Sequence, residues 1–485
     1  PHSVYIPASE MQEINEPLDG EFDGIGVVFN MAPDTVIVLN VIPQGPSDKA
    51  GIKAGDRIIE INDTLVAGQK IPQRDVVKKL RGPRGTTVHL GLGRQGIGEL
   101  VGVDVVRDKI PIKSIESAFR IADGIGYIRH SDFTEGCYED MRAAVEKLRT
   151  GGELKGLILD YRSNGGGIMQ EAIKILGMFV PKGTEVVSTK GRTEDSRQVY
   201  RTSSEPILPD LPLAVLINGN SASASEIVTG ALQDLDRAVV IGQRSYGKGL
   251  VQSPRPLGYN AMLKLTTAKY YIPSGRCIQA IDYSHSQEGS VKAIPDSLIT
   301  EYRTRAGRKV YDGGGIMPDI RTEPEYISRF AMTLYALGFV EDFGDDYMRR
   351  HPDQRIDIRN FSITDRDYAD FAEFMKDKKV PYESDTRRAL KALKKAAEDD
   401  RFADLKEKFD RVEAELKDDT QTNLETYRKE IVETINNDIV MRHGYSEGVI
   451  EHSLKDDPEV LRATEILGDG AEYTRIVTEQ DTPRK

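Results

Sequence analysis

The stretch NGNSASASEIVTGALQDLDRAVVIGQRSYGKGLVQ, Asn218 to Gln252, decides the fold of the chain around it. The apolar run Leu211 to Ile217 before it predicts a buried strand. After a polar turn, Ser225 to Gln233 predicts a helix, and Ala238 to Ile241 predicts a second strand. A serine on such a turn lies beside the free N–H groups of a helix start, which can hold a developing oxyanion.

Two interpretations of Ser223 stay open from the residues alone. Ser223 and Glu226 form a capping-box pattern, which stabilises a helix start and needs no chemistry. In the other interpretation Ser223 is a nucleophile, and its base must come from elsewhere because the stretch holds no histidine. Lys248 in SYGKG is the candidate base, since Gly247 and Gly249 beside it allow close approach of the backbone.

A lysine acts as a base only when it is neutral, so burial must lower its pKa from about 10.4 to near 7. Such a shift costs about 4 to 5 kcal/mol, and a partner must orient the neutral amine. Gln252 lies four residues after Lys248 and is the candidate partner, because an amide does not restore the charge.

Together the motifs SASASE, QD, G-x-x-x-Y-GKG and VQ resemble the carboxyl-terminal processing proteases, which are S41-type serine peptidases with a Ser–Lys dyad and an embedded PDZ domain. The resemblance implies that Ser223 is the nucleophile, Lys248 the general base and Gln252 its positioning residue. It also implies an oxyanion hole from the N–H of Ala224 and of Gly166 or Gly167. The S-x-x-K arrangement of β-lactamases is excluded, because the third residue after Ser223 is a glutamate.

The glycine turn RSNGGG departs from the commoner family pattern. Ser163 and Gly165 stand where that pattern has Asn and Pro. Both changes are tolerable in a site that works through backbone N–H groups. Tyr271 and Arg276 are candidates for lining the substrate channel, with a structural role as the alternative for each.

The segment GPSDKAGIKAGDRIIEIND resembles a PDZ domain, whose backbone N–H groups capture the carboxylate of a peptide's C-terminus while its last residues add as a strand. The resemblance implies a carboxylate-binding loop formed by Phe22, Gly24, Ile25, Gly26 and Val27. The groove beside it lies between Val27–Phe29 and a helix that carries Val76, Val77 and Leu80. Such a groove prefers protein substrates with apolar C-terminal tails.

The composition argues against several kinds of partner and site. The 485 residues carry a net charge of −12, which argues against nucleic acid as a partner. No apolar run reaches the length of a membrane span, about 18 residues or more. Cys137 and Cys277 are too few for a disulfide framework or a zinc cluster, and the sequence leaves open whether they pair. The seven histidines have no metal spacing, so no cofactor is expected.

We therefore expect a multi-domain α+β protein. Residues 1–21 are the remnant of an N-terminal helical segment, and 22–107 form a β-sandwich-like PDZ domain. Residues 108–325 form an α/β protease core of the crotonase/ClpP-like type, and 326–485 form a mostly helical domain. The chain does not start at methionine, and the resemblance favours the periplasm or bacterial cell envelope, with an export signal cut off.

The C-terminal region is the least determined. Of residues 371–430, 31 of 60 are charged with both signs nearly equal, which predicts solvated helices. One apolar stripe is formed by Phe402, Leu405, Phe409, Val412 and Leu416. Further along the chain, Ile431, Ile435 and Ile439 continue it. It predicts helices packed on the protease, or else a homo-oligomer interface or a dock for an adaptor.

The expected function is that of a serine endopeptidase which binds the C-terminus of a protein substrate and cleaves by an acyl-enzyme mechanism. The alternative is a pseudo-protease, or a scaffold that binds partners through its PDZ domain.

Overall fold

The computed structural model describes residues 3–32, 35–282, 292–293, 299–416 and 419–478. The chain divides into two compact units. The first contains Pro1–Phe22, Pro111–Pro324 and Leu454–Lys485, and the second contains Asp23–Ile110 and Glu325–Ser453. Each unit is therefore built from segments that are far apart in the sequence.

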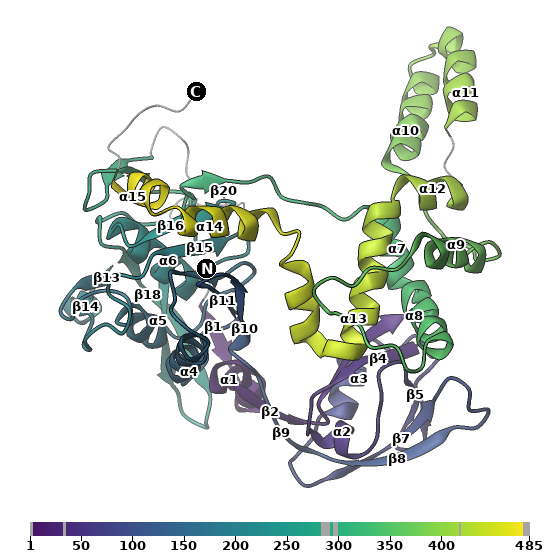
Figure 1. The fold of residues 1–485 in the computed structure, drawn as a ribbon, viewed down its shortest axis with the longest axis horizontal. Helices are drawn as coiled ribbons and strands as arrows, with labels where there is room; N and C mark the ends of the chain where they lie inside the picture. The colour runs from purple at the N-terminus through teal and green to yellow at the C-terminus, as the bar shows by residue number, and fades with distance from the viewer. Residues whose placement is uncertain (1–2, 33–34, 283–291, 294–298, 417–418, 479–485) are drawn as a thin grey trace. The chain divides into compact units, whose positions relative to one another are not determined.

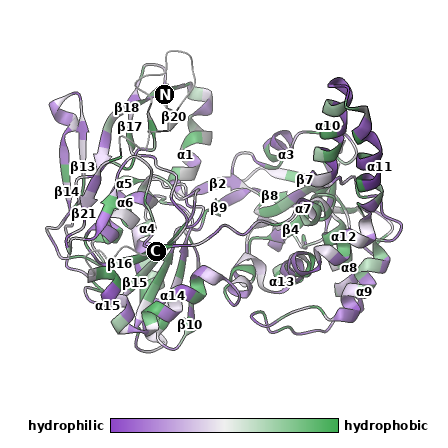
Figure 2. Ribbon diagram, turned by 90° about the horizontal axis from the view of Figure 1, so that it is seen from above, coloured by the Kyte–Doolittle hydropathy of each residue, from purple (hydrophilic) through white to green (hydrophobic). Residues whose placement is uncertain are grey.

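The first unit is centred on a six-stranded sheet, counted over the described residues (Figure 1). Its first two strands are antiparallel, and the others run parallel. In spatial order the strands are β10 (Ile115–Ala122), β11 (Ile125–His130), β12 (Gly156–Asp160), β15 (Leu213–Ile217), β16 (Ala238–Gly242) and β23 (Ile320–Arg321). Every residue of β12, β15 and β16 is buried, as expected for parallel strands covered on both faces. Figure 2 shows the hydrophobic colour of β15 and β16.

Different helices cover the two faces of this sheet. Leu157 and Leu159 of β12 belong to the core shared with α4 (Cys137–Thr150), α5 (Met169–Leu176) and α6 (Ala224–Asp234). Side chains alternate along a strand, so Gly156 and Ile158 face the other way. There Leu467 of α14 (Pro458–Gly468) lies against Gly156, and α15 (Gly470–Thr478) follows. Helices α14 and α15 thus cover the face of this sheet that α4, α5 and α6 leave open.

A second set of strands adjoins this core. In the described residues it consists of β1 (Val4–Ile6), β18 (Met262–Tyr271), β13 (Glu185–Gly191) and β14 (Gln198–Arg201), with β17 (Leu250–Pro256) paired to β18. Smaller elements of the unit are η1 (Ala8–Glu10), α1 (Met11–Asp19), η2 (Glu194–Ser196), β19 (Ile281–Asp282), β20 (Lys292–Ala293), β21 (Glu301–Arg303) and β22 (Lys309–Tyr311). The hairpin β17–β18 matters most, because it continues directly from the SYGKG loop.

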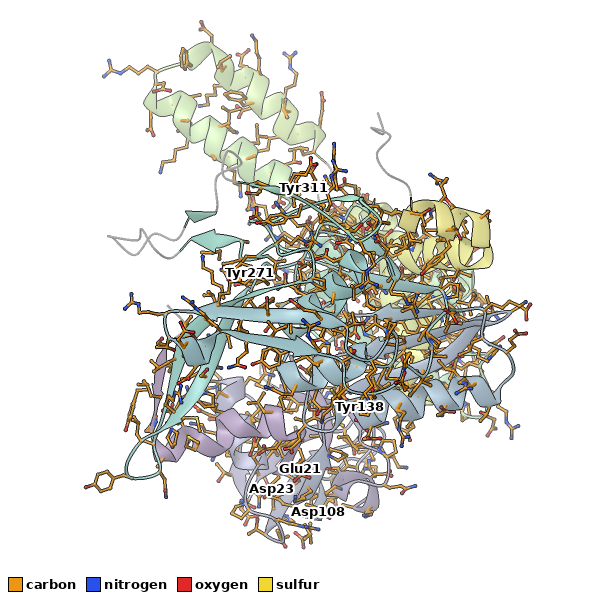
Figure 3. All side chains as sticks on the ribbon, turned by 90° about the vertical axis from the view of Figure 1, so that its left-hand side faces the viewer. Glu21, Asp23, Asp108, Tyr138, Tyr271 and Tyr311 are labelled. Carbon is orange, nitrogen blue, oxygen red and sulfur yellow. The ribbon has the colours of Figure 1, made fainter. Side chains whose placement is uncertain are left out.

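The second unit begins with a small sheet around one apolar core. The sheet has the order β3 (Val27–Ala32), β4 (Thr35–Val41), β5 (Arg57–Ile61), β7 (Thr87–Gly93), β8 (Val101–Val106), with β6 (Thr64–Leu65) beside β5. Two helices, α2 (Pro46–Lys49) and α3 (Gln73–Leu80), accompany it. The ribbon of β2 (Glu21–Gly24) and β9 (Asp108–Pro111) carries the acidic residues Glu21, Asp23 and Asp108 (Figure 3). This is the architecture that the PDZ-like segment predicts.

The helices of the second unit pack against this small sheet. Their core includes the predicted Ile431, Ile435 and Ile439 on α13 (Arg428–Ser453). The other helices are α7 (Arg329–Ala336), α8 (Phe339–Arg350), α9 (Asp365–Phe374), α10 (Asp385–Asp399), α11 (Lys406–Glu415) and α12 (Thr420–Thr426). Asn30 of β3 donates to Glu341 of α8 at 3.0 Å. The predicted 326–485 segment is therefore shared between the units: α7 to α13 accompany the PDZ domain, and α14 and α15 accompany the protease core.

The predicted apolar stripe from Phe402 to Leu416 is not a domain core. The chain forms a short 3-10 turn, η4 (Ala403–Leu405), before α11 begins, and no described residue of α11 is buried. Phe402 and Val412 are about half exposed. Figure 2 shows the largely hydrophilic colour of α11, which the dense charges of this segment explain.

Within the described residues, no helix combines the length and the apolar character needed to cross a membrane.

Candidate active site

Ser223 occupies a strained turn between β15 and α6. Its φ of 58° and ψ of −114° form a conformation that residues with a side chain rarely adopt. Ser221 and Ser225 on either side donate their hydroxyls to the carbonyls of Tyr161 and Asn164, at 2.8 and 2.9 Å. Among the described residues, Ser223 is thus the one of these three serines whose hydroxyl proton is not donated. Backbone strain at a single residue of a turn is common at functional sites.

Glu226 joins the serine turn to the SYGKG loop. Its side-chain oxygen Oε2 accepts the backbone N–H of Ser223 at 2.8 Å and that of Lys248 at 2.9 Å. The other oxygen, Oε1, accepts the N–H of Gly247 at 2.7 Å and the hydroxyl of Ser245. The carboxyl group is buried, which raises the pKa of Glu226, while the four hydrogen bonds oppose that rise. The capping box that the sequence predicts is therefore present and also brings Ser223 and Lys248 together.

Tyr270 on β18 makes a second bridge between the same two residues. Its buried hydroxyl lies 3.2 Å from the carbonyl oxygen of Ser223 and also hydrogen-bonds to the carbonyl oxygen of Lys248. The sequence analysis missed Tyr270, because it is 47 positions from Ser223 and reaches the site only through the β17–β18 hairpin. Glu226 is part of the SASASE motif, but the sequence pattern indicates only its role as a helix cap and not its contact with Lys248.

The environment of Lys248 makes its amine less basic than an ordinary lysine. Partial burial lowers the pKa of the Lys248 amine, and the positive charge of Lys264 on β18 lowers it further. The carboxylate of Glu226 opposes both effects. Gln252 lies half-buried on β17, next to an irregularity in the pairing with β18 between Val251 and Gln252. The amine that the sequence analysis requires to be weakly basic is therefore shifted in the required direction.

The glycine turn after β12 packs directly on the serine turn. A Cβ atom on Gly166 would lie 2.6 Å from the carbonyl oxygen of Ala222 and 2.7 Å from Cβ of Ser223. Gly166 and Gly167 both have a positive φ, 97° and 145°. Asn164 fastens the two turns, because its carbonyl accepts the N–H of Ala222 and its side chain accepts the N–H of Gly166 at 2.8 Å. The N–H of Gly166 is thus already engaged.

The other candidates fall in different places. Arg276 is fully buried and donates to Gln233 and Asp234, so it is structural and does not line a channel. Tyr271 on β18 is labelled in Figure 3, and the amine of Lys190 lies 4.4 Å from the centre of its ring. Cys137 and Cys277 are both free thiols, so they do not pair. No group of side chains with metal-binding geometry is present among the described residues.

The residues predicted to bind a peptide lie around strand β3. Gly24, Ile25 and Gly26 are buried just before this strand, and Val27 begins it. On helix α3, Leu80 faces the core and Val77 is half-buried. Strand β3 is at the end of its sheet, and its outer edge carries no strand among the described residues. Such an edge offers backbone groups to an added strand. Phe22 lies half-buried on β2.

Comparison with known proteins finds matches to three domain models. Residues 124–285 match the model of peptidase family S41, residues 37–94 match a PDZ domain, and residues 330–467 match the C-terminal helical domain of probable PDZ-proteases.

Among the relatives, a carboxy-terminal-processing protease of Bartonella bacilliformis is 40% identical over 284 residues, which are 58% of this chain and 64% of that protein. The carboxy-terminal processing protease CtpB of Bacillus subtilis is 33% identical, over 57% of each chain. These matches span less than two thirds of either relative. A solved photosystem II D1 C-terminal processing protease is 25% identical over 70% of this chain and 81% of that one, with a TM-score of 0.36. The chain thus contains a peptidase family S41 domain, a PDZ domain and the C-terminal helical domain of probable PDZ-proteases, and its relatives include carboxy-terminal processing proteases.

Proposed function

We propose that the chain is a serine endopeptidase in which Ser223 attacks the peptide bond and Lys248 is the general base. The observation that carries the proposal is the shared acceptor Glu226 Oε2, which holds the backbone of both residues. A nucleophile and its base must lie within proton-transfer reach, and a shared buried carboxylate that holds the backbone of both residues supports that pairing. The lowered pKa of Lys248 supports the same assignment.

The reaction proceeds in two halves. Neutral Lys248 takes the hydroxyl proton as Ser223 Oγ forms a bond to the carbonyl carbon of the substrate. The C–N bond then breaks, and the leaving amine receives the proton from the Lys248 ammonium. Water attacks the acyl-enzyme with Lys248 again as base, and this step releases the new C-terminus and restores Ser223.

The oxyanion hole is assigned to the N–H groups of Ala224 and Gly167. Ala224 is the first residue of helix α6, where backbone N–H groups lack partners within the helix. Of the two glycines that the family resemblance offers, Gly166 already donates to Asn164, so Gly167 is the member we propose. Gln252 remains the proposed positioning residue for the amine.

Peptide hydrolysis by matched lysine variants tests this assignment. Lys248→Ala should lower kcat for an unstructured reporter protein with an apolar C-terminus by about 10²- to 10⁴-fold, the usual contribution of a general base. Lys269→Ala is the control, because Lys269 is an exposed lysine on β18. Full activity of folded Lys248→Ala protein would refute the dyad. Ser223→Ala should likewise be inactive while it retains its thermal unfolding transition.

We further propose that the PDZ domain captures the free C-terminus of the substrate along the open edge of β3. Support comes from the end position of β3 in its sheet and from Val77 on α3, whose apolar side chain is only half-buried. The test is fluorescence anisotropy with the inactive Ser223→Ala chain and a peptide that ends in apolar residues. Amidation of the peptide C-terminus, or Val77→Arg, should weaken binding about tenfold or more, since the carboxylate or the groove is lost. Equal affinity for the amidated peptide would exclude this mode of capture.

The alternative of a binding scaffold without catalysis predicts tight peptide binding with no turnover. The reporter assay separates the two functions directly.

A further inference from the structure

The first residue of the glycine turn RSNGGG, Arg162, is held by side chains from residues 457 and 459. Arg162 follows β12, and its Nη1 donates to Asp457 Oδ2 at 2.6 Å and to Glu459 Oε2 at 2.8 Å. Its Nη2 donates to Asp160 Oδ2 at 2.6 Å. Nearly 300 positions separate Arg162 from the two acids at the start of α14, and all four residues belong to the first unit.

The three carboxylates are themselves fixed. Asp160 is fully buried and also accepts the hydroxyl of Tyr127 at 2.7 Å and Nη1 of Arg129 at 3.1 Å. Glu459 is buried and accepts the side-chain amide of Gln243 at 2.7 Å in addition to Arg162. A guanidinium removed from water in this way is stable only while its acidic partners stay in place.

Asp457 has two roles that can be separated. Its Oδ1 accepts the N–H groups of Glu459 and Val460 at 2.9 and 3.0 Å and so caps helix α14. Its Oδ2 binds Arg162. An asparagine can keep the cap through its oxygen but loses the charge that holds the guanidinium.

Helix α14 is docked independently of these ion pairs. Leu467 lies so close to β12 that a Cβ on Gly156 would come within 2.9 Å of it. On α15, the hydroxyl of Tyr473 donates to the carbonyl of Arg237 at 2.8 Å. Removal of the two acidic charges should therefore leave α14 and α15 in place on the sheet.

The backbone on both sides of Arg162 holds the nucleophile turn. Before it, the carbonyl of Tyr161 accepts the hydroxyl of Ser221 at 2.8 Å. After it, Ser163 has a strained φ of 62°, and the carbonyl of Asn164 accepts the hydroxyl of Ser225 at 2.9 Å. A shift of the Arg162 side chain would thus be passed to the glycine turn and to the turn that carries Ser223.

We propose that Asp457 and Glu459 are positioning residues of the peptidase site, which act through Arg162 to hold the glycine turn in the geometry that the oxyanion requires. The inference rests on the proposed function in what it says about catalysis, and on the hydrogen bonds alone in what it says about the turn. In this proposal residues 454–478 help to position the active site. The peptidase domain is therefore incomplete without them.

The test uses the full chain with Asp457→Asn, Glu459→Gln and both together. The controls are Asp456→Asn and Glu465→Gln, which change exposed acids of the same segment. Two readouts are measured: kcat and KM for the reporter substrate, and amide hydrogen exchange of residues 161–167 and 218–226. In the double variant we expect kcat to fall about 10- to 100-fold with KM within about twofold, as for a displaced but intact site. Exchange should rise in the two turns and not in β11, and the controls should match the wild type.

Each remaining outcome decides one part. Unchanged kcat and unchanged exchange in the double variant would overturn the proposal. If the double variant loses its unfolding transition, the Asp457→Asn variant, which keeps its helix cap, decides instead. Faster exchange throughout the sheet of folded Asp457→Asn protein would overturn the proposal, because the acid would then serve general stability. The wild-type chain could also lack peptidase activity while the double variant shows faster exchange confined to the two turns. That result would refute the proposed function and leave the role of the acids standing.

Discussion

At the scale of single residues, the site depends on one carboxyl group and one strained serine. Glu226 would be an ordinary helix cap if it accepted only the N–H of Ser223. Instead it also receives three donors from the SYGKG loop, and the Ser223 backbone has a positive φ. A strained conformation persists only where its surroundings over-determine it, and here Glu226 and Tyr270 supply that constraint.

Glu226→Gln should therefore cost both stability and activity. The glutamine amide would turn an N–H donor toward groups that are donors themselves, so at least one buried N–H loses its acceptor. The expected loss is about 1 to 3 kcal/mol in the free energy of unfolding, measured by denaturant titration. Activity in the reporter assay should fall far more than in Glu153→Gln, an exposed control. Wild-type activity in Glu226→Gln would contradict the bridging role.

The charge of Lys264 gives a prediction about pH. The base form of Lys248 is the neutral amine, so kcat/KM should rise with pH through the lowered pKa of Lys248. Lys264→Gln removes a like charge, which raises that pKa and moves the acid limb of the profile to higher pH. Lys269→Gln on the same strand serves as the control. An acid limb that stays in place, or moves to lower pH, would show that Lys248 is not the titrating base.

At the scale of secondary-structure elements, the sequence predicted the strand, turn and helix around Ser223 well. The reason is that β15, α6 and β16 follow one another in the chain, and both strands are short apolar runs whose residues are all buried. It could not predict Tyr270 or the acids of α14, because these reach the site through hairpin register and through docking of a distant helix. The prediction that the stripe from Phe402 to Leu416 is packed in a core was wrong for a related reason. Periodicity shows that one face of a helix is apolar, but not that another element covers it.

The packing of the two turns gives a matched pair of glycine variants. Gly166→Ala would place a methyl group against Ala222 and Ser223 in a backbone conformation with positive φ, and should abolish activity. Gly165→Ala has no atom within 4 Å of the added carbon and should be folded and active, with unfolding free energy changed by no more than about 1 kcal/mol. Reporter hydrolysis and thermal melts check both. Equal activity of the two variants would contradict the close approach of the turns.

At the scale of the whole molecule, the two units are each assembled from distant segments. The sequence motifs predicted the kinds of domain, because each motif is local. They did not predict that the C-terminal helices divide at about Ser453 between the two units. That division follows from contacts such as Asn30 with Glu341 in one unit and Arg162 with Glu459 in the other, which no local pattern records.

Glu341 makes the stability of the second unit depend on pH. Its burial raises the pKa of Glu341 to about 7, helped by Asp438 and opposed by Asn30 and Arg442. Since the unfolded value is about 4.3, the folded unit binds this proton more tightly. The contribution of the group to stability is thus complete below about pH 4.3 and is lost as the pH rises to about 7.

Replacement of Glu341 by glutamine should remove the loss of stability that ionisation of Glu341 causes as the pH rises. The stability advantage of Glu341→Gln over the wild type should grow between about pH 4.3 and 7 and then level off, at no more than about 4 kcal/mol. Denaturant unfolding across that range measures it, and Glu433→Gln, an exposed position on α13, is the control. A difference that does not vary with pH would mean that Glu341 does not hold a proton in the folded unit.

The central claim is that Ser223 is activated by a neutral Lys248. Its most direct test is the rate at which a fluorophosphonate labels the chain at neutral pH, with the modified peptide identified by mass spectrometry. We expect a single label at Ser223 in the wild type and in Lys269→Ala, and a labelling rate about 10²-fold or more lower in folded Lys248→Ala. Labelling of Ser223 at the wild-type rate without Lys248, or labelling of another serine instead, would contradict it.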